Sequence, residues 1–555
     1  MDNQIPIPLC PICKSKMILR TARKTGRKFW GCSRFSKGCR GSRSYKKPAL
    51  QRIEMDFSNI ILSKYQQDAL DFFLQSEENM LLEATAGSGK SFLLMLLLHN
   101  SDKNKKSALL SFNADIARSN ASKAPENVRC STISALGRNN VLKTYPHLKN
   151  KVDKFKLHKI LDAYYDKLIE QSGEERVKPY KSARNAIINL VDLLKANLFT
   201  ASEDNIAKLK EKHSLEWDSS LKQDWVYDTV KWLHYSSIQD KSMIDFSDMI
   251  DMCLNDNEVN CEKFDLLLVD EAQDLSPSFI EFVQRSIKQT GRIIVVGDRY
   301  QSIYAFRAAD SKAMDNLKNS LEAKVLPLSM TYRNSKAVVE NINQRFPHIK
   351  HEALSNAPEG KVDWIKNSTF TKIVKEGDMV LCRNNAPLVK PALMLLAEGI
   401  KAVIKGKEIG VDLERLIEKV IKSFHAEEDI ASLLAGLEIY EREETAKLIK
   451  LKYVASADTL SDKVEAIVAM TYGLKTIDQL LDRIATIFSE TQQGVTFSSI
   501  HKAKGLEAEN VFILKPELMP SKRAITDEDI QQEENCEFVA LSRPKLNLFY
   551  VEKET

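Results

Sequence analysis

Residues 80–98 read MLLEATAGSGKSFLLMLLL, and this stretch changes character twice. Its first five residues are typical of a buried strand, the next contain two glycines, and residues 92–98 form the longest apolar run of the chain. Strand, glycine-bearing loop and helix in this order predict an α/β fold, with phosphate held by backbone N–H groups where the helix begins.

The loop fits the phosphate-binding pattern G-x-x-x-x-G-K-[ST], with Ala84 in place of its first glycine. In this pattern Lys90 reaches the β- and γ-phosphates of a nucleotide, and the hydroxyl of Ser91 takes one position around Mg²⁺. The residues predicted to bind the nucleotide here are Ala84, Thr85, Ala86, Gly87, Ser88, Gly89, Lys90 and Ser91.

A second apolar strand, in LLLVDEAQD at 266–274, ends in two acids. Such a strand end presents Asp270 to Mg²⁺ and Glu271 to a water molecule as a general base. The alternative is a pair of acids that only cap a helix. The apolar strand before them and the phosphate loop upstream favour the catalytic interpretation.

The length, the apolar runs and the charge of the chain limit the class of protein. A chain of 555 residues is long enough for several domains. It has no apolar run of about 18 residues and no signal-peptide pattern, so we expect no membrane partner and a cytoplasmic or nucleoid-associated location. The net charge of +5 is uneven, because residues 1–50 carry thirteen Lys and Arg but one acid. A basic arm of this density favours contact with nucleic-acid phosphate over a merely solvated tail.

Four of the nine cysteines fall in this basic arm, as Cys10, Cys13, Cys32 and Cys39. Two close pairs joined by a short spacer are typical of a tetrahedral zinc site. CPIC, then FWGCS and the last cysteine, resemble the zinc ribbons at the C-terminal ends of bacterial type I topoisomerases. The aromatic and basic residues of the spacer suit a single-stranded nucleic acid. The alternative is a zinc-bearing structural knob.

The order of motifs from residue 62 to 545 resembles the superfamily 1 helicases of the UvrD/Rep type. In LSKYQQDA, Gln66 matches the glutamine that recognises adenine, and in LSMTYRNS, Tyr332 matches the tyrosine that stacks on it. Glu507, in VTFSSIHKAKGLE, matches the residue near the ribose.

Three further matches concern the γ-phosphate. Gln301, in VVGDRYQSIYAFRAAD, matches the phosphate-sensing glutamine of the family. Arg333 matches its arginine finger, and Arg543, in CEFVALSRPK, matches a second arginine on the γ-phosphate. With Lys90 and the two acids, they form the catalytic set that the resemblance implies.

The resemblance implies two RecA-like P-loop domains, each with a helical insertion, behind a small N-terminal zinc ribbon. The interval from Arg333 to Val495 is short for UvrD/Rep proteins and is closer to the F-box DNA helicase group. The predicted segments are 1–48 (zinc ribbon), 58–135 and 244–325 (first RecA-like domain), 136–243 (its insertion), 326–408 and 489–555 (second RecA-like domain), and 409–488 (its reduced insertion).

The resemblance also implies a path for single-stranded DNA. Aromatic side chains stack on bases of any sequence, contributing about 1–3 kcal/mol per base, although the same residues also suit a buried core. The predicted DNA contacts are Phe112, Asn113, Thr132, Tyr304, Phe306, Arg307 and His501. Ser134 stands where the family usually has histidine.

The implied function is an ATP-dependent DNA helicase or translocase, moving 3′→5′ with ATP, Mg²⁺ and Zn²⁺ as cofactors. Its expected partners are single-stranded or forked DNA, with replication or repair proteins as further candidates. One alternative is a translocase that displaces proteins and unwinds little. Another is a zinc-bearing recruitment protein with a decayed ATPase, which the complete catalytic set disfavours. RNA remains an alternative substrate.

Overall fold

The computed structural model divides into two compact units. The first comprises Met1–Asp56 with Ala121–Lys123, and the second comprises Phe57–Asn120 with Ala124–Thr555. The structure describes every residue except 1–7, 16, 22–27, 33–38, 45–51, 214, 219–220, 304–311, 425–428, 451–453, 489–493, 522–523, 525 and 553–555.

The first unit is a three-stranded antiparallel sheet in the order β1-β2-β3. Its strands are β1 (Met17–Thr21), β2 (Lys28–Cys32) and β3 (Ser42–Ser44). In its described part the buried hydrophobic cluster consists of Cys10, Met17 and Cys32. A core of this size does not stabilise a domain, so the fold of this unit depends on another source of free energy.

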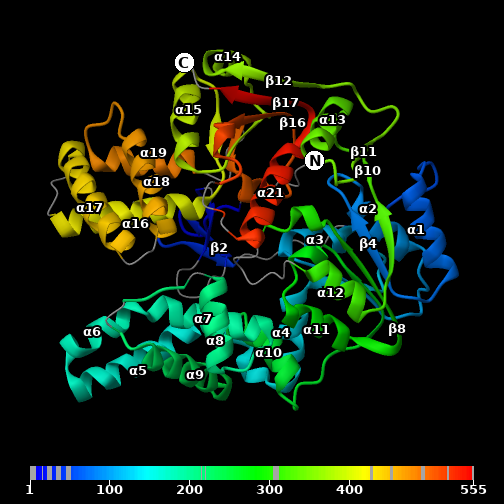
Figure 1. The fold of residues 1–555 in the computed structure, drawn as a ribbon, viewed down its shortest axis with the longest axis horizontal. Helices are drawn as coiled ribbons and strands as arrows, with labels where there is room; N and C mark the ends of the chain where they lie inside the picture. Colours follow the sequence, from blue (N-terminus) through cyan, green and yellow to red (C-terminus); the bar gives the residue numbers. More distant parts are fainter. Residues whose placement is uncertain are drawn as a thin grey trace. The chain divides into compact units, whose positions relative to one another are not determined.

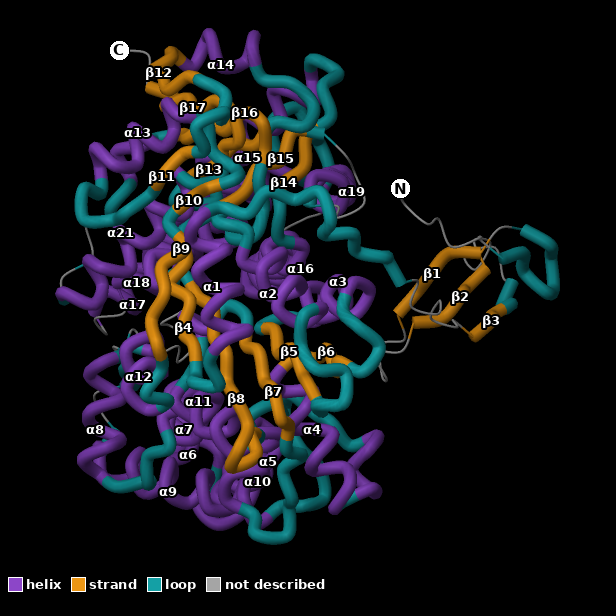
Figure 2. Tube along the Cα trace, turned by 90° about the vertical axis from the view of Figure 1, so that its right-hand side faces the viewer, coloured by secondary structure: helices purple, strands orange, loops and turns teal. Residues whose placement is uncertain are grey.

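The second unit contains two six-stranded parallel sheets (Figure 2). The first has the strand order β6-β5-β7-β8-β4-β9, and its central strands are apolar on both faces because helices cover both sides. Its strands are β4 (Met80–Ala84), β5 (Ser107–Ser111), β6 (Val128–Thr132), β7 (Phe264–Val269), β8 (Ile287–Gly297) and β9 (Lys324–Leu328).

The second sheet has the order β12-β17-β16-β13-β15-β14, and every pair in it is parallel. Its strands are β12 (Lys361–Lys366), β13 (Met379–Cys382), β14 (Ala402–Ile404), β15 (Val495–Ser499), β16 (Ala508–Leu514) and β17 (Pro544–Glu552). The short parallel strands β10 (Met330–Thr331) and β11 (Glu352–Ala353) form a separate pair. The predicted α/β class is confirmed.

The helices of the first sheet include α2, which is buried along almost its whole length, as the apolar run predicts. Helix α1 begins with a capping box between Ser63 and Gln66, which fixes the position of Gln66. These helices are α1 (Lys64–Gln75), α2 (Lys90–His99), α3 (Ala114–Lys123), α4 (Ile133–Thr144), α10 (Asp248–Asn255), α11 (Pro277–Arg285) and α12 (Ala313–Ser320).

Helices α5–α9 gather into one bundle (Figure 1) with a hydrophobic core of its own. They are α5 (Lys156–Ser172), α6 (Glu174–Ser182), α7 (Arg184–Asn197), α8 (Glu203–Lys212) and α9 (Gln223–Gln239). The bundle interrupts the first sheet between β6 and β7, where the sequence predicts a helical insertion.

Short 3₁₀ helices are η2 (Pro146–Asn150), η3 (Ala272–Asp274), η4 (Arg299–Gln301) and η6 (Pro516–Leu518).

A second helical group separates β14 from β15 and shares a core with the second sheet. It comprises α16 (Lys407–Phe424), α17 (Ile430–Lys450), α18 (Val454–Met470) and α19 (Ile477–Ile487). The other helices around the second sheet are α13 (Lys336–Arg345), α14 (Asn367–Ile373), α15 (Ala386–Ala397), α20 (Ile500–Ala503) and α21 (Asp527–Leu541). Over the described residues, none of the helices has the length and apolar character needed to cross a membrane.

A buried ion cluster ties the α5–α9 bundle to α10. Both carboxylate oxygens of Asp248 accept from ammonium groups, one from Lys156 at 2.8 Å and the other from Lys195 at 2.8 Å. All three side chains are almost fully excluded from solvent. Burial alone would raise the pKa of Asp248, but the two positive charges outweigh it and lower that pKa.

Replacing Asp248 with asparagine should destabilise the joint between the bundle and α10, because two buried ammonium groups lose their counter-charge. Breaking such a buried pair costs about 3–5 kcal/mol. Hydrogen exchange in α5 and α7 of the full chain should speed up accordingly. Asp228→Asn, on the exposed surface of the same bundle, is the matched control and should change stability by less than about 0.5 kcal/mol. Equal protection in both variants would contradict the role of the cluster.

Candidate active site

The phosphate loop connects β4 to α2 and contains two left-handed residues, Gly87 with φ 72° and Gly89 with φ 77°. Their backbone conformation, which side chains disfavour, turns successive N–H groups toward one point. Among the described residues, no side chain accepts a hydrogen bond from the first turn of α2, so these backbone N–H groups suit an anion. Lys90 begins this helix, and its Nζ lies 3.1 Å from Oε2 of Glu271.

Asp270 and Glu271 follow β7 directly, as the sequence predicts, and their pKa values are shifted in opposite directions. Burial and the neighbouring Glu271 raise the pKa of Asp270 to about 7, while Ser91 hydrogen-bonds its side chain. Burial opposes ionisation of Glu271, yet Lys90 lowers its pKa to about 2. Ser91 and Asp270 together therefore form a suitable oxygen pair for Mg²⁺, and Glu271 stays ionised, as a general base must.

A chain of hydrogen bonds extends from Glu271 across the first sheet. Gln273 donates to Oε2 of Glu271 at 2.5 Å, and its Oε1 accepts from the N–H of Asp298 at 2.9 Å. Asp298 in turn accepts from Nε2 of Gln301 at 2.6 Å. Burial raises the pKa of Asp298 to about 6, against the effect of Lys90. The predicted phosphate-sensing residue is thus connected to the predicted base.

The loop after β10 is in direct contact with the phosphate loop. Residues from β10 to β17 are called the second half below. The N–H of Tyr332 donates to the carbonyl of Gly87 at 2.8 Å. A Cβ added at Gly87 would lie 2.5 Å from Oγ1 of Thr331 and 2.6 Å from Cβ of Arg333. Glycine is required here by both its φ and this close approach. The nucleotide site therefore lies between the two sheets.

The two residues predicted to hold adenine are in contact. The hydroxyl of Tyr332 donates to Oε1 of Gln66 at 2.6 Å, and Nε2 of Gln66 lies 3.5 Å from the carbonyl of Ser88. Gln66 is buried, whereas Tyr332 is 41% exposed. An exposed ring beside a buried amide is the arrangement needed to stack on a base and read its edge.

The two predicted arginines lie on the same side of the cleft but differ in their partners. Nε of Arg333 is 2.8 Å from Oε2 of Glu507, the residue predicted near the ribose. Arg543 is 1% exposed, donates to the carbonyl of Val539 at 2.8 Å, and approaches Oε1 of Gln301 to 3.5 Å. The structure thus places predicted residues from positions 66 to 543 around one cleft.

Four residues at this cleft are missing from the sequence prediction: Gln273, Asp298, Lys504 and Asn535. Lys504 donates to Asp274 at 2.6 Å and to the carbonyl of Gln301 at 2.7 Å. The acids of DEAQD and the lysines of HKAKGLE were visible in sequence. Their pairing was not, because about 230 residues separate them.

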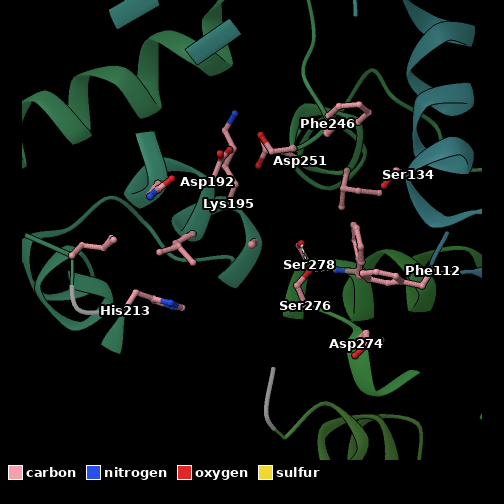
Figure 3. Close-up of a pocket in the computed structure, with 17 residues that line it drawn as sticks. Phe112, Ser134, Asp192, Lys195, His213, Phe246, Asp251, Asp274, Ser276 and Ser278 are labelled. Atoms are coloured by element: carbon pink, nitrogen blue, oxygen red, sulfur yellow. Dashed lines mark hydrogen bonds between the residues drawn. The ribbon is translucent and has the colours of Figure 1, made fainter. Parts of the chain in front are cut away.

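A cavity of about 570 Å³ lies between the ends of β5 and β6 and the helical bundle (Figure 3). Phe112 and Ser134 lie on one side of it and His213 on the other, with Asp274 also in its wall. Phe112, a predicted DNA contact, is therefore available to a ligand in the cavity. The lining combines aromatic rings and hydroxyl groups with three carboxylates, those of Asp192, Asp251 and Asp274.

The other predicted DNA contacts have structural partners of their own. Asn113 caps α3 by accepting from two backbone N–H groups, and Thr132 caps α4 by accepting from Ala135. His501 lies 3.5 Å from the thiol of Cys536, and burial lowers its pKa to about 4. The predicted contacts Tyr304, Phe306 and Arg307 lie outside the described residues.

The four N-terminal cysteines converge in the first unit. Their Sγ atoms all lie within 4.8 Å of one another, with Cys13 and Cys32 3.3 Å apart and Cys10 and Cys39 3.7 Å apart. Tetrahedral zinc with Zn–S bonds of about 2.3 Å separates sulfurs by about 3.8 Å. The donor set and its spacing therefore fit Zn²⁺, held by Cys10, Cys13, Cys32 and Cys39.

Comparison with known proteins agrees with this geometry. Residues 62–322 match the UvrD/REP helicase N-terminal domain. Residues 62–322 thus form a domain of the UvrD/REP helicase type. The match covers the phosphate loop, the Asp270–Glu271 strand end and the Gln301 loop, so the predicted family is confirmed.

Individual relatives of the UvrD type are distant. F-box DNA helicase protein 1 of Schizosaccharomyces pombe is 24% identical over 310 residues, 52% of this chain and 34% of that protein. F-box DNA helicase 1 of Gallus gallus is 23% identical over 500 residues, 83% of this chain and 46% of that protein. ATP-dependent DNA helicase Rep of Buchnera aphidicola is 21% identical over 454 residues, 60% of this chain and 70% of that protein. This chain spans less than half the length of the two F-box helicases.

The thiolate cluster predicts about one zinc per chain, measured by mass spectrometry of the full-length protein. Cys13→Ser should lose most of the metal and the thiolate–cobalt absorption of a Co²⁺-exchanged sample. Cys130→Ser, outside the cluster, is the matched control and should keep both. Wild-type protein that contains no zinc and reacts freely with thiol reagents at these cysteines would contradict the assignment.

Proposed function

We propose that this protein is an ATP-dependent DNA helicase that moves 3′→5′ along single-stranded DNA. The observation that carries the proposal is the meeting of residues from both sheets around one phosphate loop. Lys90, Asp270, Glu271 and Gln301 lie beside strands of the first sheet, whereas Arg333 follows β10 and Arg543 precedes β17 of the second sheet. The polarity rests on the family resemblance.

Binding of ATP would use the elements already in contact. The ring of Tyr332 and the amide of Gln66 suit the base, and Glu507 suits the ribose. Lys90 and the N–H groups of residues 87–90 suit the phosphates. Mg²⁺, when bound to Ser91 and Asp270, would neutralise charge on the β- and γ-phosphates.

Hydrolysis would then depend on the second sheet. Glu271 holds the attacking water as an ionised base, and Gln301 orients it beside the γ-phosphate. Arg333 and Arg543 stabilise the charge of the transition state, an effect worth about 10³–10⁵ in rate for an arginine finger. Because these arginines reside on the second half, turnover requires both halves to be closed on the nucleotide.

The single-stranded DNA path is supported by two features. The cavity beside Phe112 opens at the carboxyl ends of β5 and β6, where the family resemblance places DNA. Gln301 ends η4, and the chain reaches the predicted contacts at 304–307 within three residues. The basic N-terminal arm with its cysteine cluster would add a second, salt-sensitive contact to DNA.

Glu271→Gln should abolish turnover and retain ATP binding, because it removes the base and keeps the shape of the side chain. General-base catalysis contributes about 10²–10⁴-fold, and kcat with single-stranded DNA should fall by this factor. Glu281→Gln, on the surface of α11, is the matched control and should behave as wild type. Unchanged turnover in Glu271→Gln would exclude this residue as the base.

Polarity and unwinding are tested with partial duplexes that carry a single-stranded tail at either the 3′ or the 5′ end. A 3′→5′ helicase should release the strand from the 3′-tailed substrate, with ATP and Mg²⁺. Release from the 5′-tailed substrate alone would overturn the polarity. If ATP is hydrolysed and a bound protein is displaced without strand release, the protein is a translocase instead.

A further inference from the structure

Asn334 directly follows Arg333 in the chain, and its side chain is buried, with 2% of the residue exposed. Its amide Nδ2 donates to the carbonyl of Pro544 at 2.6 Å and to that of Ser542 at 3.3 Å. These two carbonyls lie on either side of Arg543 in the chain. One amide group, next to the first arginine of the cleft, therefore holds the backbone around the second.

The turn that carries Arg333 is closed on itself by Thr331. Oγ1 of Thr331 accepts from the N–H of Arg333 at 3.2 Å and donates to Oδ1 of Asn334 at 3.1 Å. Nη1 of Arg333 donates at 3.2 Å to the carbonyl of Ser542, which is also bound by Asn334. The turn before α13 and the start of β17 are thus joined at the two arginines, although 210 residues separate Asn334 from Pro544.

His351 completes the hydrogen bonding of the Asn334 side chain. Its Nε2 lies 3.2 Å from Oδ1 of Asn334, and because an amide oxygen can only accept, the ring donates this N–H. Burial and the charge of Arg333 lower the pKa of His351 to about 4, so the ring is neutral at neutral pH. The ring also meets Phe538 edge-on, with centroids 6.1 Å apart. With two bonds accepted by Oδ1 and two donated by Nδ2, the amide of Asn334 is held in one orientation.

The bonds of Asn334 concern the arginines rather than the groups that suit ATP before reaction. Lys90 and the N–H groups at the start of α2 belong to the first sheet. Arginine fingers act on the charge that develops in the transition state. Their effect depends on placement, since a shift of about 1 Å at a catalytic group costs about 10²-fold in rate. A side chain that sets the spacing of two arginines therefore affects the chemical step more than it affects the binding of ATP.

We infer that Asn334 is a positioning residue that sets the spacing between Arg333 and Arg543, with His351 holding its amide in the required orientation. The inference rests on the proposed function, because it assigns both arginines to the transition state of ATP hydrolysis. Asn334 acts through the backbone of the two loops that carry the arginines. The guanidinium of Arg333 stays able to exchange its partner, because Asn334 fixes the turn and not the end of that side chain.

The test compares Asn334→Ala with Asn341→Ala in the full chain. Asn341 is a half-buried residue of α13 that donates to the hydroxyl of Tyr550 at 3.1 Å, so its loss also removes a hydrogen bond within the second half. Steady-state kinetics are measured with Mg²⁺ and a single-stranded oligonucleotide over a range of ATP concentrations. Asn334→Ala should lower kcat by about 10²-fold and change KM for ATP by less than about threefold. Asn341→Ala should match the wild type.

Nucleotide binding separates a positioning role from a structural one. Each folded variant is titrated with a non-hydrolysable ATP analogue and with ADP plus aluminium fluoride, which imitates the phosphoryl group in flight. Asn334→Ala should weaken the aluminium fluoride complex by about 10²-fold and leave affinity for the ATP analogue almost unchanged. A purely stabilising role would lower the melting temperature but leave kcat and both affinities of the folded protein as in the wild type, and that result would overturn the inference.

His351→Phe is the second variant, and it keeps an aromatic ring beside Phe538 while removing the donor to Asn334. It should lower kcat and the affinity for ADP with aluminium fluoride in the same direction as Asn334→Ala, by a smaller factor, because the bonds to the carbonyls around Arg543 remain. If Asn334→Ala does not fold, this variant decides.

Arg333→Ala distinguishes failure of this inference from failure of the proposed function. It should lower kcat by about 10³–10⁵-fold, and its combination with Asn334→Ala should lose less than the product of the two single losses, as residues that act as a unit do. Wild-type protein without ATP hydrolysis, or Arg333→Ala with wild-type kcat, would contradict the proposed function and the inference with it. Turnover that depends on Arg333 but not on Asn334 or His351 would leave the helicase standing and refute the positioning role.

Discussion

The cleft depends on the buried positive charge of Lys90. Three carboxylates, those of Asp270, Glu271 and Asp298, surround it, and burial disfavours the ionised form of each. Like charges gathered in a protein interior are tolerated only where opposite charge lies within reach. Lys90 is placed by the glycines of the phosphate loop, so the backbone conformation of that loop determines the electrostatics of the whole site. The same charges raise the pKa of Lys90 against the effect of its burial.

The second half contributes further positive charge at matching positions. Lys504 pairs with Asp274, and the guanidinium of Arg543 is buried near Gln301. The acids thus belong to the first sheet and much of their compensating charge belongs to the second. Closure of the second half on the first therefore brings positive charge to these acids, and Lys504 lowers the pKa of Glu271 and of Asp274 against the effect of burial. The close approach of Gly87 to Thr331 makes this closure sterically possible.

The sequence predicted the parts of this arrangement that are local. The phosphate loop, the acids after β7 and the α/β class follow from patterns within about ten residues, where periodicity and turn chemistry operate. The convergence of Gln66 with Tyr332 and of Arg333 with Glu507 came from the family resemblance, since no local pattern indicates which distant residues meet. Lys504 and Asn535 escaped prediction because their partners are main-chain carbonyls and an acid far along the chain. Asn113 and Thr132 show the reverse case, because residues predicted to contact DNA also serve as helix caps.

The two arginines of the cleft differ in how freely they can change partner. Arg543 donates to backbone carbonyls of Val539 and Leu506 and to the hydroxyl of Ser542, so its guanidinium is fixed by the fold. Arg333 donates to one backbone carbonyl, that of Ser542 at 3.2 Å, and its Nε pairs with Glu507, which is half-exposed and also binds Lys545. Exchange of Glu507 for a phosphate would cost Arg333 little, because Lys545 remains to compensate the released carboxylate. Arg543 thus suits a fixed part of the closed site, and Arg333 suits the part that responds when a nucleotide arrives.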